Sequence, residues 1–185
     1  MIVAGMDWSL SCPAICIYDT SKPLTFKNCK FFFLTNKNKQ VGNFGNIHGF
    51  AMQEYKSVEE RVDNISEWGI TVLKTANAKR ACIEGYAMGA KGQVFTIAEN
   101  GGLIKHKMYK AGIEFITPAP TSVKKLFTGK GNANKEIMYN SAMSIDPTTP
   151  DVKTLYGWAI DGNPTSDIID SFAMVHYLLN EMKQE

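Results

Sequence analysis

The chain of 185 residues carries 20 Lys and Arg against 18 Asp and Glu, a formal net charge of +2, and 44% of its residues are apolar. This length predicts one domain spanning residues 1–185, with enough apolar side chains to fill a core. No apolar run reaches the roughly 18 residues of a membrane-spanning helix. Asp7 interrupts the apolar N-terminus, so we expect neither a signal peptide nor contact with a membrane.

Three strands in an antiparallel meander are predicted for the start of the chain. Residues 1–7 form an apolar run, a polar turn follows at 9–13, and residues 14–18 and 27–34 are typical of strands. Residues 35–55 are rich in Asn and Gly and have no sustained period. They predict a long loop inserted after the third strand.

Helices alternate with short strands in the rest of the predicted order. Ser57 and Glu60 form a capping box that predicts the start of a helix. The later elements are expected as a strand at 80–86, a helix at 93–111, a strand at 114–117, helices at 122–127 (capped by Thr121) and 133–144, an irregular stretch at 151–165 and a last helix at 166–182. A meander followed by βα units predicts an α/β fold, a mixed five-stranded sheet with helices on both faces.

The cysteines are expected to be packed thiols in a reducing, cytoplasmic compartment. Their spacings fit no zinc motif, and Cys16 and Cys82 lie in apolar runs. Positive charge, in contrast, is concentrated: residues 101–135 contain seven lysines and one glutamate, which leaves the remainder of the chain acidic. A basic segment of this kind favours a polyanion such as nucleic acid.

Four carboxylates stand at positions where acidic residues are costly. Asp7 and Glu84 each end an apolar strand, and Asp167 and Asp170 open the apolar last helix. A buried carboxylate is expensive to desolvate unless something compensates its charge, and a hard divalent cation such as Mg²⁺ takes oxygen ligands. Because Asp167 and Asp170 are three residues apart, both lie on one helix face. The pattern indicates phosphoryl chemistry on nucleic acid.

Four stretches resemble the motifs of one nuclease family. Residues 5–11 read GMDWSLS, similar to a first-strand G-[IV]-D-x-[SG] motif. The second stretch is Ile-Glu at 83–84, at the end of a strand, followed by Ala-Lys-Gly at 90–92. Residues 118–135 follow the pattern P-x-x-V-K…G-x-G-x-A-x-K, the most specific of the four, and residues 167–171 resemble a D-x-x-D-[AS] helix start. The chain therefore resembles the RuvC-type Holliday junction resolvases of the ribonuclease H-like superfamily.

The resemblance implies an activity and the residues that carry it. The expected enzyme is a structure-selective endonuclease that hydrolyses phosphodiester bonds in four-way and other branched DNA with two Mg²⁺ ions, or Mn²⁺ in their place. The metal and catalytic residues it implies are Asp7, Glu84, Asp167 and Asp170. The phosphate-binding lysines it implies are Lys124 and Lys135, with Lys125 and Lys130 as weaker candidates. The segment 35–55 departs from the bacterial pattern and favours a phage or viral relative.

Two further roles follow from the same resemblance. Tyr86 is a candidate for stacking on an unpaired base at the junction, with Phe95 as its competitor and core packing as the plainer explanation. Gly101 and Gly102 lie inside a predicted helix, where each costs about 1 kcal/mol relative to Ala. Close packing against a second copy would offset that cost and place a homodimer interface on this helix, although a local kink also explains the pair.

Three other functions compete with this one. The first is another ribonuclease H-like nuclease, acting on RNA–DNA hybrids or as part of a transposase; the lysine-containing motif disfavours it. The second is a junction-binding protein without catalysis, which the four intact carboxylates disfavour. The third is an actin-like or sugar-kinase ATPase, which needs a duplicated domain that 185 residues cannot hold.

Overall fold

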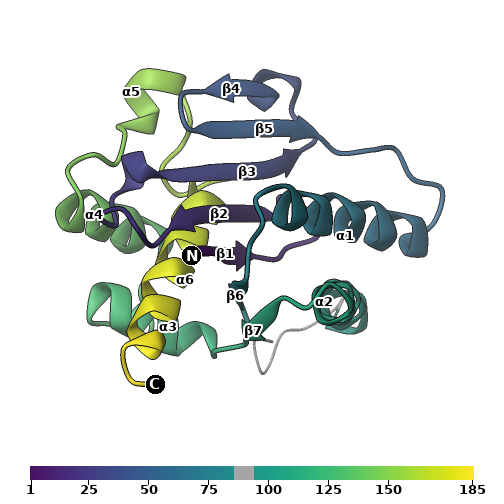
Figure 1. Cartoon of the computed structure of the whole chain (residues 1–185). Helices are drawn as coiled ribbons and strands as arrows, with labels where there is room; N and C mark the ends of the chain where they lie inside the picture. The colour runs from purple at the N-terminus through teal and green to yellow at the C-terminus, as the bar shows by residue number, and fades with distance from the viewer. Residues whose placement is uncertain (86–93) are drawn as a thin grey trace.

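A mixed sheet runs through the middle of the protein (Figure 1). The computed structural model describes residues 1–85 and 94–185, and within them the strand order is β4-β5-β3-β2-β1-β6-β7. The strands are β1 (Ile2–Asp7), β2 (Ala14–Asp19), β3 (Cys29–Thr35), β4 (Gly42–Phe44), β5 (Ile47–Ala51), β6 (Arg80–Ile83) and β7 (Glu114–Ile116). The antiparallel pairing of β1 with β2 and of β2 with β3 confirms the predicted meander. The predicted α/β class is confirmed as well.

The prediction of a structureless loop at 35–55 is wrong. This segment contains β4 and β5, and β5 pairs in parallel with β3, so the described sheet has seven strands instead of the predicted five. Gly49 in β5 permits a close contact, because a Cβ atom there would lie 1.9 Å from the backbone oxygen of Gln40. Phe44 in β4 packs its ring on Tyr156 and Trp158, which fixes the hairpin to the body of the protein.

Six α-helices are present in the described residues. They are α1 (Val58–Thr75), α2 (Val94–Lys110), α3 (Pro120–Thr128), α4 (Lys135–Ile145), α5 (Val152–Tyr156) and α6 (Thr165–Met182). The predicted cap of α1 is confirmed, since the Ser57 hydroxyl accepts a hydrogen bond from the Glu60 amide. The predicted cap of α3 is wrong: Ala119 precedes a helix that starts at Pro120, which lacks the amide hydrogen that a first helical turn leaves unpaired. The stretch 151–165, predicted to be irregular, contains α5.

Helices cover both faces of the sheet and create two cores. α6 crosses one face over β1 and β2, with α3 and α4 beside it, and Phe31 and Phe172 meet in that core. α1 and α2 pack together on the other face, where Met6 and Ile104 are fully buried. None of the described helices combines the length and apolar character required to cross a membrane.

A glycine in β1 sets the position of α6. A Cβ atom on Gly5 would lie 2.1 Å from the backbone oxygen of Ser171, so only glycine lets the helix pass this close to the strand. Gly5 and Asp7 are two residues apart and therefore share the α6 face of the sheet. The close approach brings the N-terminal turns of α6 to the end of β1.

Candidate active site

Four carboxylates from three elements meet where β1 ends. Asp7 is the last residue of β1, and Glu84 follows β6, the parallel neighbour of β1. The Glu84 amide donates to the backbone oxygen of Met6 at 3.3 Å, which holds the two strand ends side by side. Asp167 and Asp170 belong to the first turns of α6. The structure thus brings together all four residues that the sequence singled out.

Burial raises the pKa of each carboxyl group, and repulsion between carboxylates adds to it at Asp7, Glu84 and Asp170. Burial is the largest cause for all four. The pKa of Asp7 lies well above its usual range, with Asp170, Asp167 and Glu84 adding repulsion in that order. The pKa of Asp170 reaches about 7 and that of Asp167 about 6. Near neutral pH the site therefore concentrates negative charge that the protein only partly compensates.

Two lysines of the basic segment supply the partial compensation. Lys124 lowers the pKa of Glu84 and Asp170, and Lys135 lowers that of Asp167 and Asp170. Lys124 lies in α3, which packs on α6 through Val123 and Phe127. Lys135 is the first residue of α4, directly after the cap Asn134, whose side chain accepts from the Ile137 amide.

The connection between α3 and α4 lets both lysines face the carboxylates. Gly129 ends α3 with a φ of +78°, a left-handed conformation that glycine adopts without strain. Lys125 and Lys130 are exposed in α3 and in the turn after it, and their predicted contact with DNA stays a prediction. Tyr86 lies outside the described residues. Its competitor Phe95 is 83% exposed at the start of α2.

Sequence reasoning missed two neighbours of the site. The Cys12 thiol forms a hydrogen bond with Asp167, which lowers the pKa of that carboxyl. Burial raises the pKa of the thiol, and the charges of Asp167 and Asp7 raise it further. Lys37 acts on Cys12 in the opposite direction and brings a third lysine to this region. Cys12 lies in a turn and Lys37 in the segment predicted to be a loop, so neither carried a periodic or motif signal.

Trp8 fixes the residue that follows the first carboxylate. Its indole Nε1 donates to the backbone oxygen of Asn100 in α2 at 3.1 Å, and its ring stacks on Trp68 of α1 with 6.3 Å between centroids. Gly69 gives the ring room, because a Cβ atom there would lie 2.3 Å from the indole. Asp7 is consequently tied through its neighbour to both helices on the opposite face of the sheet.

The donor set suits a hard divalent cation. Two buried carboxylates, Asp7 and Asp167, and two half-buried ones, Glu84 and Asp170, supply oxygen ligands, and their combined negative charge exceeds the positive charge of the two lysines that act on them. The side chains are not arranged as a closed cage: among the described residues no three His, Cys, Asp or Glu groups are placed to hold an ion together. The chemistry and charge of the site fit a metal, and binding one requires the carboxylates to move closer.

The match to a family model shows the family of this chain. A model of the crossover junction endodeoxyribonuclease RuvC family matches residues 27–147, more than half of the chain. The chain belongs to this family. The predicted enzyme class, crossover junction endodeoxyribonuclease, is thereby confirmed. The matched segment contains Glu84, Lys124 and Lys135, whereas Asp7 and the two aspartates of α6 lie outside it.

Solved structures of resolvases share the fold. The structure of Thermus thermophilus RuvC aligns with a TM-score of 0.61 and 16% identity, over 99% of this chain and 97% of that one. The same protein in complex with a Holliday junction substrate gives 0.63 and 18%, over 99% and 96%. The yeast mitochondrial Holliday junction resolvase Ydc2 gives 0.50 and 15%, over 98% and 85%. Curated protein sequences yield no match.

Proposed function

We propose that this protein resolves Holliday junctions and related branched DNA by cutting phosphodiester bonds at the carboxylate cluster of Asp7, Glu84, Asp167 and Asp170. The convergence of these four carboxylates, two of them buried and two half-buried, at one strand end is the observation that carries the proposal. Membership of the RuvC family supports it, and so does the shared fold with a resolvase seen bound to a Holliday junction.

The same four carboxylates would hold two Mg²⁺ ions, for which Mn²⁺ can substitute. Two such ions generate a hydroxide nucleophile and stabilise the leaving oxygen of an in-line displacement. The raised pKa values of Asp167 and Asp170 support this role, since burial disfavours the negative charge of both groups and a bound cation would stabilise it.

The lysines would hold the DNA strand against the cluster. Lys124, in the middle of α3, and Lys135, at the start of α4, both act on the carboxylates from different helices, so they can take successive phosphates of one strand. Lysine meets phosphate as a point charge and does not read bases, which suits an enzyme that recognises branching over sequence. Lys37 would extend this positive rim on the side of Cys12.

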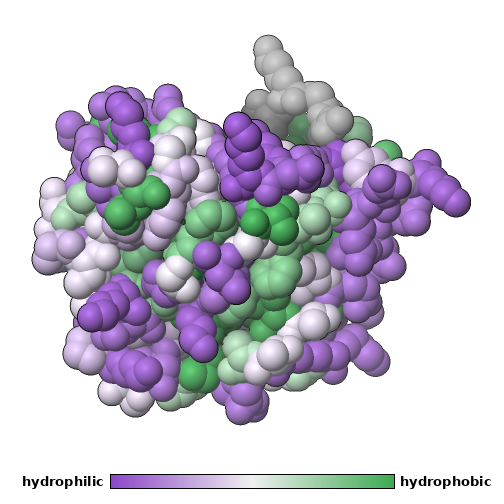
Figure 2. Space-filling view, turned by 90° about the horizontal axis from the view of Figure 1, so that it is seen from above, coloured by the Kyte–Doolittle hydropathy of each residue, from purple (hydrophilic) through white to green (hydrophobic). Residues whose placement is uncertain are grey.

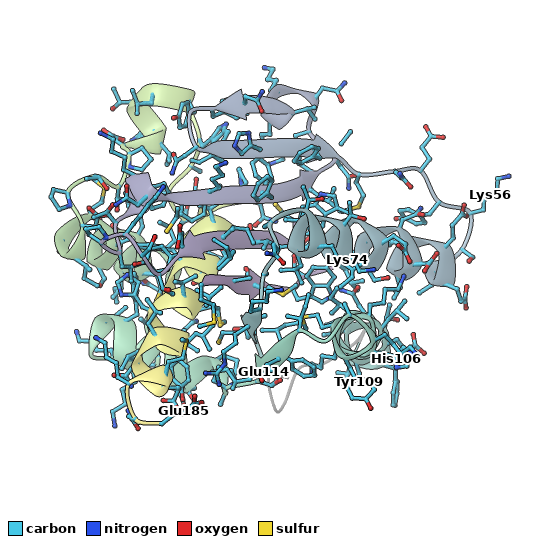
Figure 3. The ribbon with its side chains drawn as sticks, in the orientation of Figure 1. Lys56, Lys74, His106, Tyr109, Glu114 and Glu185 are labelled. Carbon is cyan, nitrogen blue, oxygen red and sulfur yellow. The ribbon has the colours of Figure 1, made fainter. Side chains whose placement is uncertain are left out.

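A homodimer would present two such sites to the two strands of a junction. α2 supports this assembly, because Phe95, Ile97 and Tyr109 are exposed on it and Figure 3 shows His106 and Tyr109 pointing away from the body of the protein. A Cβ atom on Gly102 meets nothing within 4 Å, so Gly102→Leu fits within one protomer. We expect this variant to fold, to shift toward monomer in sedimentation, and to nick junctions singly.

Mapping of cut sites tests the proposed activity. Labelled four-way junctions, forks and linear duplexes are incubated with the protein and Mg²⁺, and the cuts are mapped on each strand. We expect paired symmetric incisions in the four-way junction, with Asp7→Asn as the inactive control. Equal cutting of the linear duplex, or cutting by the control at the wild-type rate, would contradict the proposal.

A further inference from the structure

A second concave surface lies on the face of the sheet opposite the carboxylates. A groove of about 810 Å³ runs between α1 and the exposed faces of β2, β3 and β5. The alternation along β1 separates the two surfaces: Gly5 and Asp7 face α6, whereas Ala4 and Met6 face α1 and α2. In Figure 1 α1 is drawn over the end of β2, with β3 and β5 above it, and no helix of the described chain crosses in front of β3 and β5.

The groove has the dimensions and apolar walls of a site for a helix. Its floor is Ile17, Phe32 and Leu34, and its wall is a stripe of α1 from Arg61 to Thr75 that includes Ile65, Trp68 and Val72. That stripe spans fifteen residues, or about 22 Å at the rise of an α-helix. Phe50, at one border of the groove, is 43% exposed and stacks on Phe32 with 6.4 Å between ring centroids. Figure 2, seen from the side of β4, β5 and α5, shows hydrophobic residues in a band between hydrophilic ones.

The free charge at the groove is positive. Asp19 is engaged by the Ser21 amide at 3.0 Å and by the N-terminal amine at 3.9 Å, and Glu67 pairs with Lys107. Lys22 and Lys30 line the end of the groove near the C-terminus of α1, and no ion pair of the described residues includes them. An occupant with acidic side chains at that end would complete the charge balance.

Two other occupants fit less well. A second copy of this chain could offer the exposed apolar residues of α2, but that helix ends in Lys110, which would meet Lys22 and Lys30 with like charge. Nucleic acid would meet the acidic first turns of α1, which contain Glu59, Glu60 and Asp63. An apolar groove with lysines at one end favours a protein helix with an acidic flank.

We infer that this groove docks an amphipathic helix of a partner protein, about four turns long, whose apolar face enters between α1 and β3 and whose acidic flank meets Lys22 and Lys30. The inference does not rest on the proposed function, because the groove and the carboxylates occupy opposite faces of the sheet. Docking there leaves the catalytic face open, so the partner and the DNA can bind at the same time.

A designed peptide provides the test. The probe is a fluorescein-labelled, capped 18-residue peptide with leucines along one helical face and glutamates beside them, and the full-length protein is titrated into it while anisotropy is measured. Two control peptides are the scrambled sequence and the same helix with lysines in place of the glutamates. We expect the glutamate peptide to bind about ten-fold or more tightly than either control, which corresponds to about 1.4 kcal/mol.

Matched variants locate the binding. The pair Lys22→Glu and Lys30→Glu should reverse the preference, so that the lysine peptide binds more tightly, while Lys27→Glu with Lys79→Glu makes the same charge change at exposed sites that do not line the groove. Phe50→Glu should weaken binding about ten-fold, and Val41→Glu, an equally exposed apolar residue outside the groove, should not.

Three results would overturn the inference. They are the absence of peptide binding, equal binding of the glutamate and scrambled peptides, and displacement of the peptide by a single-stranded oligonucleotide, which would make the groove a nucleic-acid site. Junction cutting by Phe50→Glu reports separately on the proposed function. We expect the wild-type rate for this variant, whether or not the peptide binds.

Discussion

The two faces of the sheet in this resolvase differ in what they bury. The α6 face buries charge, since Asp7 and Asp167 are 9% and 6% exposed and repel each other. The α1 and α2 face buries apolar side chains and leaves part of its sheet uncovered as a groove. The α6 face therefore adds chemistry, at a cost in stability, to an apolar core of its own, whereas the α1–α2 face combines its apolar core with a free surface.

β1 serves both faces and connects them. Its residues alternate between α6 and the α1–α2 pair, and it ends in a carboxylate followed by a tryptophan. Asp7 enters the charged cluster, while Trp8 is held by α1 and α2. The contacts of Trp8 on the apolar face therefore hold the end of β1 in place, while on the other face the neighbouring carboxylates repel Asp7. This division of roles can be tested by changing one face at a time.

Loss of a single carboxylate should give the largest effect. Asp7→Asn, Glu84→Gln, Asp167→Asn and Asp170→Asn each keep the shape of the side chain and remove its charge. We expect cutting of a four-way junction to fall by about three orders of magnitude or more, equivalent to about 4 kcal/mol of transition-state stabilisation. Binding of the junction in Ca²⁺ should persist, because the lysines are unchanged.

A carboxylate outside the cluster provides the control for these variants. Asp161→Asn changes an exposed carboxylate of the loop before α6 and should cut at the wild-type rate. If Asp7→Asn or Glu84→Gln still cut the junction at the wild-type rate, the assignment of the active site to this cluster would be wrong. A loss of junction binding in all four variants would instead show that these residues support the fold of the DNA-binding face.

Truncation of a core side chain on the opposite face should lower the stability of the protein and leave its cutting rate nearly unchanged. Leu73 of α1 is fully buried in the apolar core and does not line the groove. Leu73→Ala should lower the free energy of unfolding by about 2–5 kcal/mol, measured by denaturant titration. At a temperature where the variant stays folded, its cutting rate should remain within about two-fold of wild type. A large loss of cutting in the folded variant would mean that the two faces are not separable.

The carboxylate cluster itself was predictable from sequence, whereas parts of its surroundings were not. Asp7 and Glu84 each end an apolar run, and that conflict between burial and charge is visible in the chain alone. β4 and β5 escaped prediction because strands of three and five residues containing glycine show no clear period. Lys37 depends on these strands for its place beside Cys12, so its role could not be seen before the fold was known.

The helix starts likewise include one that the sequence predicted and one that it did not. The start of α1 follows from a local hydrogen bond between Ser57 and Glu60, which a sequence motif encodes directly. The start of α3 was predicted after the cap Thr121 instead of at Pro120, because a proline can follow a strand or open a helix. Both roles are available to a proline, and the packing of Val123 and Phe127 on α6 decides between them.

The raised pKa values predict that one inactive variant is more stable than the wild type. A carboxyl group whose folded pKa exceeds its unfolded value makes the folded state bind more protons, so stability falls as pH rises between the two values. For Asp170 that window runs from its usual value of 3.8 to about 7. In EDTA at pH 8, Asp170→Asn should therefore raise the free energy of unfolding by about 1–2 kcal/mol.

Metal should remove this difference. Thermal unfolding in EDTA should show the wild type gaining stability as pH falls from 8 to 5, with a smaller gain in Asp170→Asn. Mg²⁺ at pH 8 should stabilise the wild type more than the variant, since only the wild type keeps the full set of ligands. A variant that is less stable than wild type in EDTA would show that Asp170 is compensated within the protein.

The lysine rim should have a smaller effect, seen in the salt dependence of DNA binding. Each phosphate contact contributes roughly −0.9 to the slope of the logarithm of affinity against the logarithm of salt concentration. Lys124→Ala and Lys135→Ala should each make this slope shallower by about one unit in a fluorescence titration of a four-way junction. Lys27→Ala, an exposed lysine remote from α3 and α4 in the chain, serves as the control. Unchanged slopes in both variants would show that the segment does not touch DNA.

The smallest expected effect tests the link between the two faces. Trp8→Phe keeps an aromatic ring against Gly69 and Trp68 but removes the donor to the Asn100 backbone, a hydrogen bond worth about 1 kcal/mol. Trp68→Phe is the matched control, because its indole nitrogen is buried without a partner and the change breaks no hydrogen bond.

If Trp8 holds Asp7 in place, Trp8→Phe should raise the Mg²⁺ concentration for half-maximal cutting by about three- to ten-fold, since the lost orientation is worth about 1 kcal/mol of metal binding. Trp68→Phe should leave this concentration unchanged. The Mg²⁺ titration separates positioning from simple destabilisation, because saturating metal restores the rate only when the ligand is misplaced and not when the fold is lost. Equal Mg²⁺ midpoints for wild type and Trp8→Phe, together with a lowered unfolding free energy, would restrict Trp8 to packing and leave the two faces energetically independent at the end of β1.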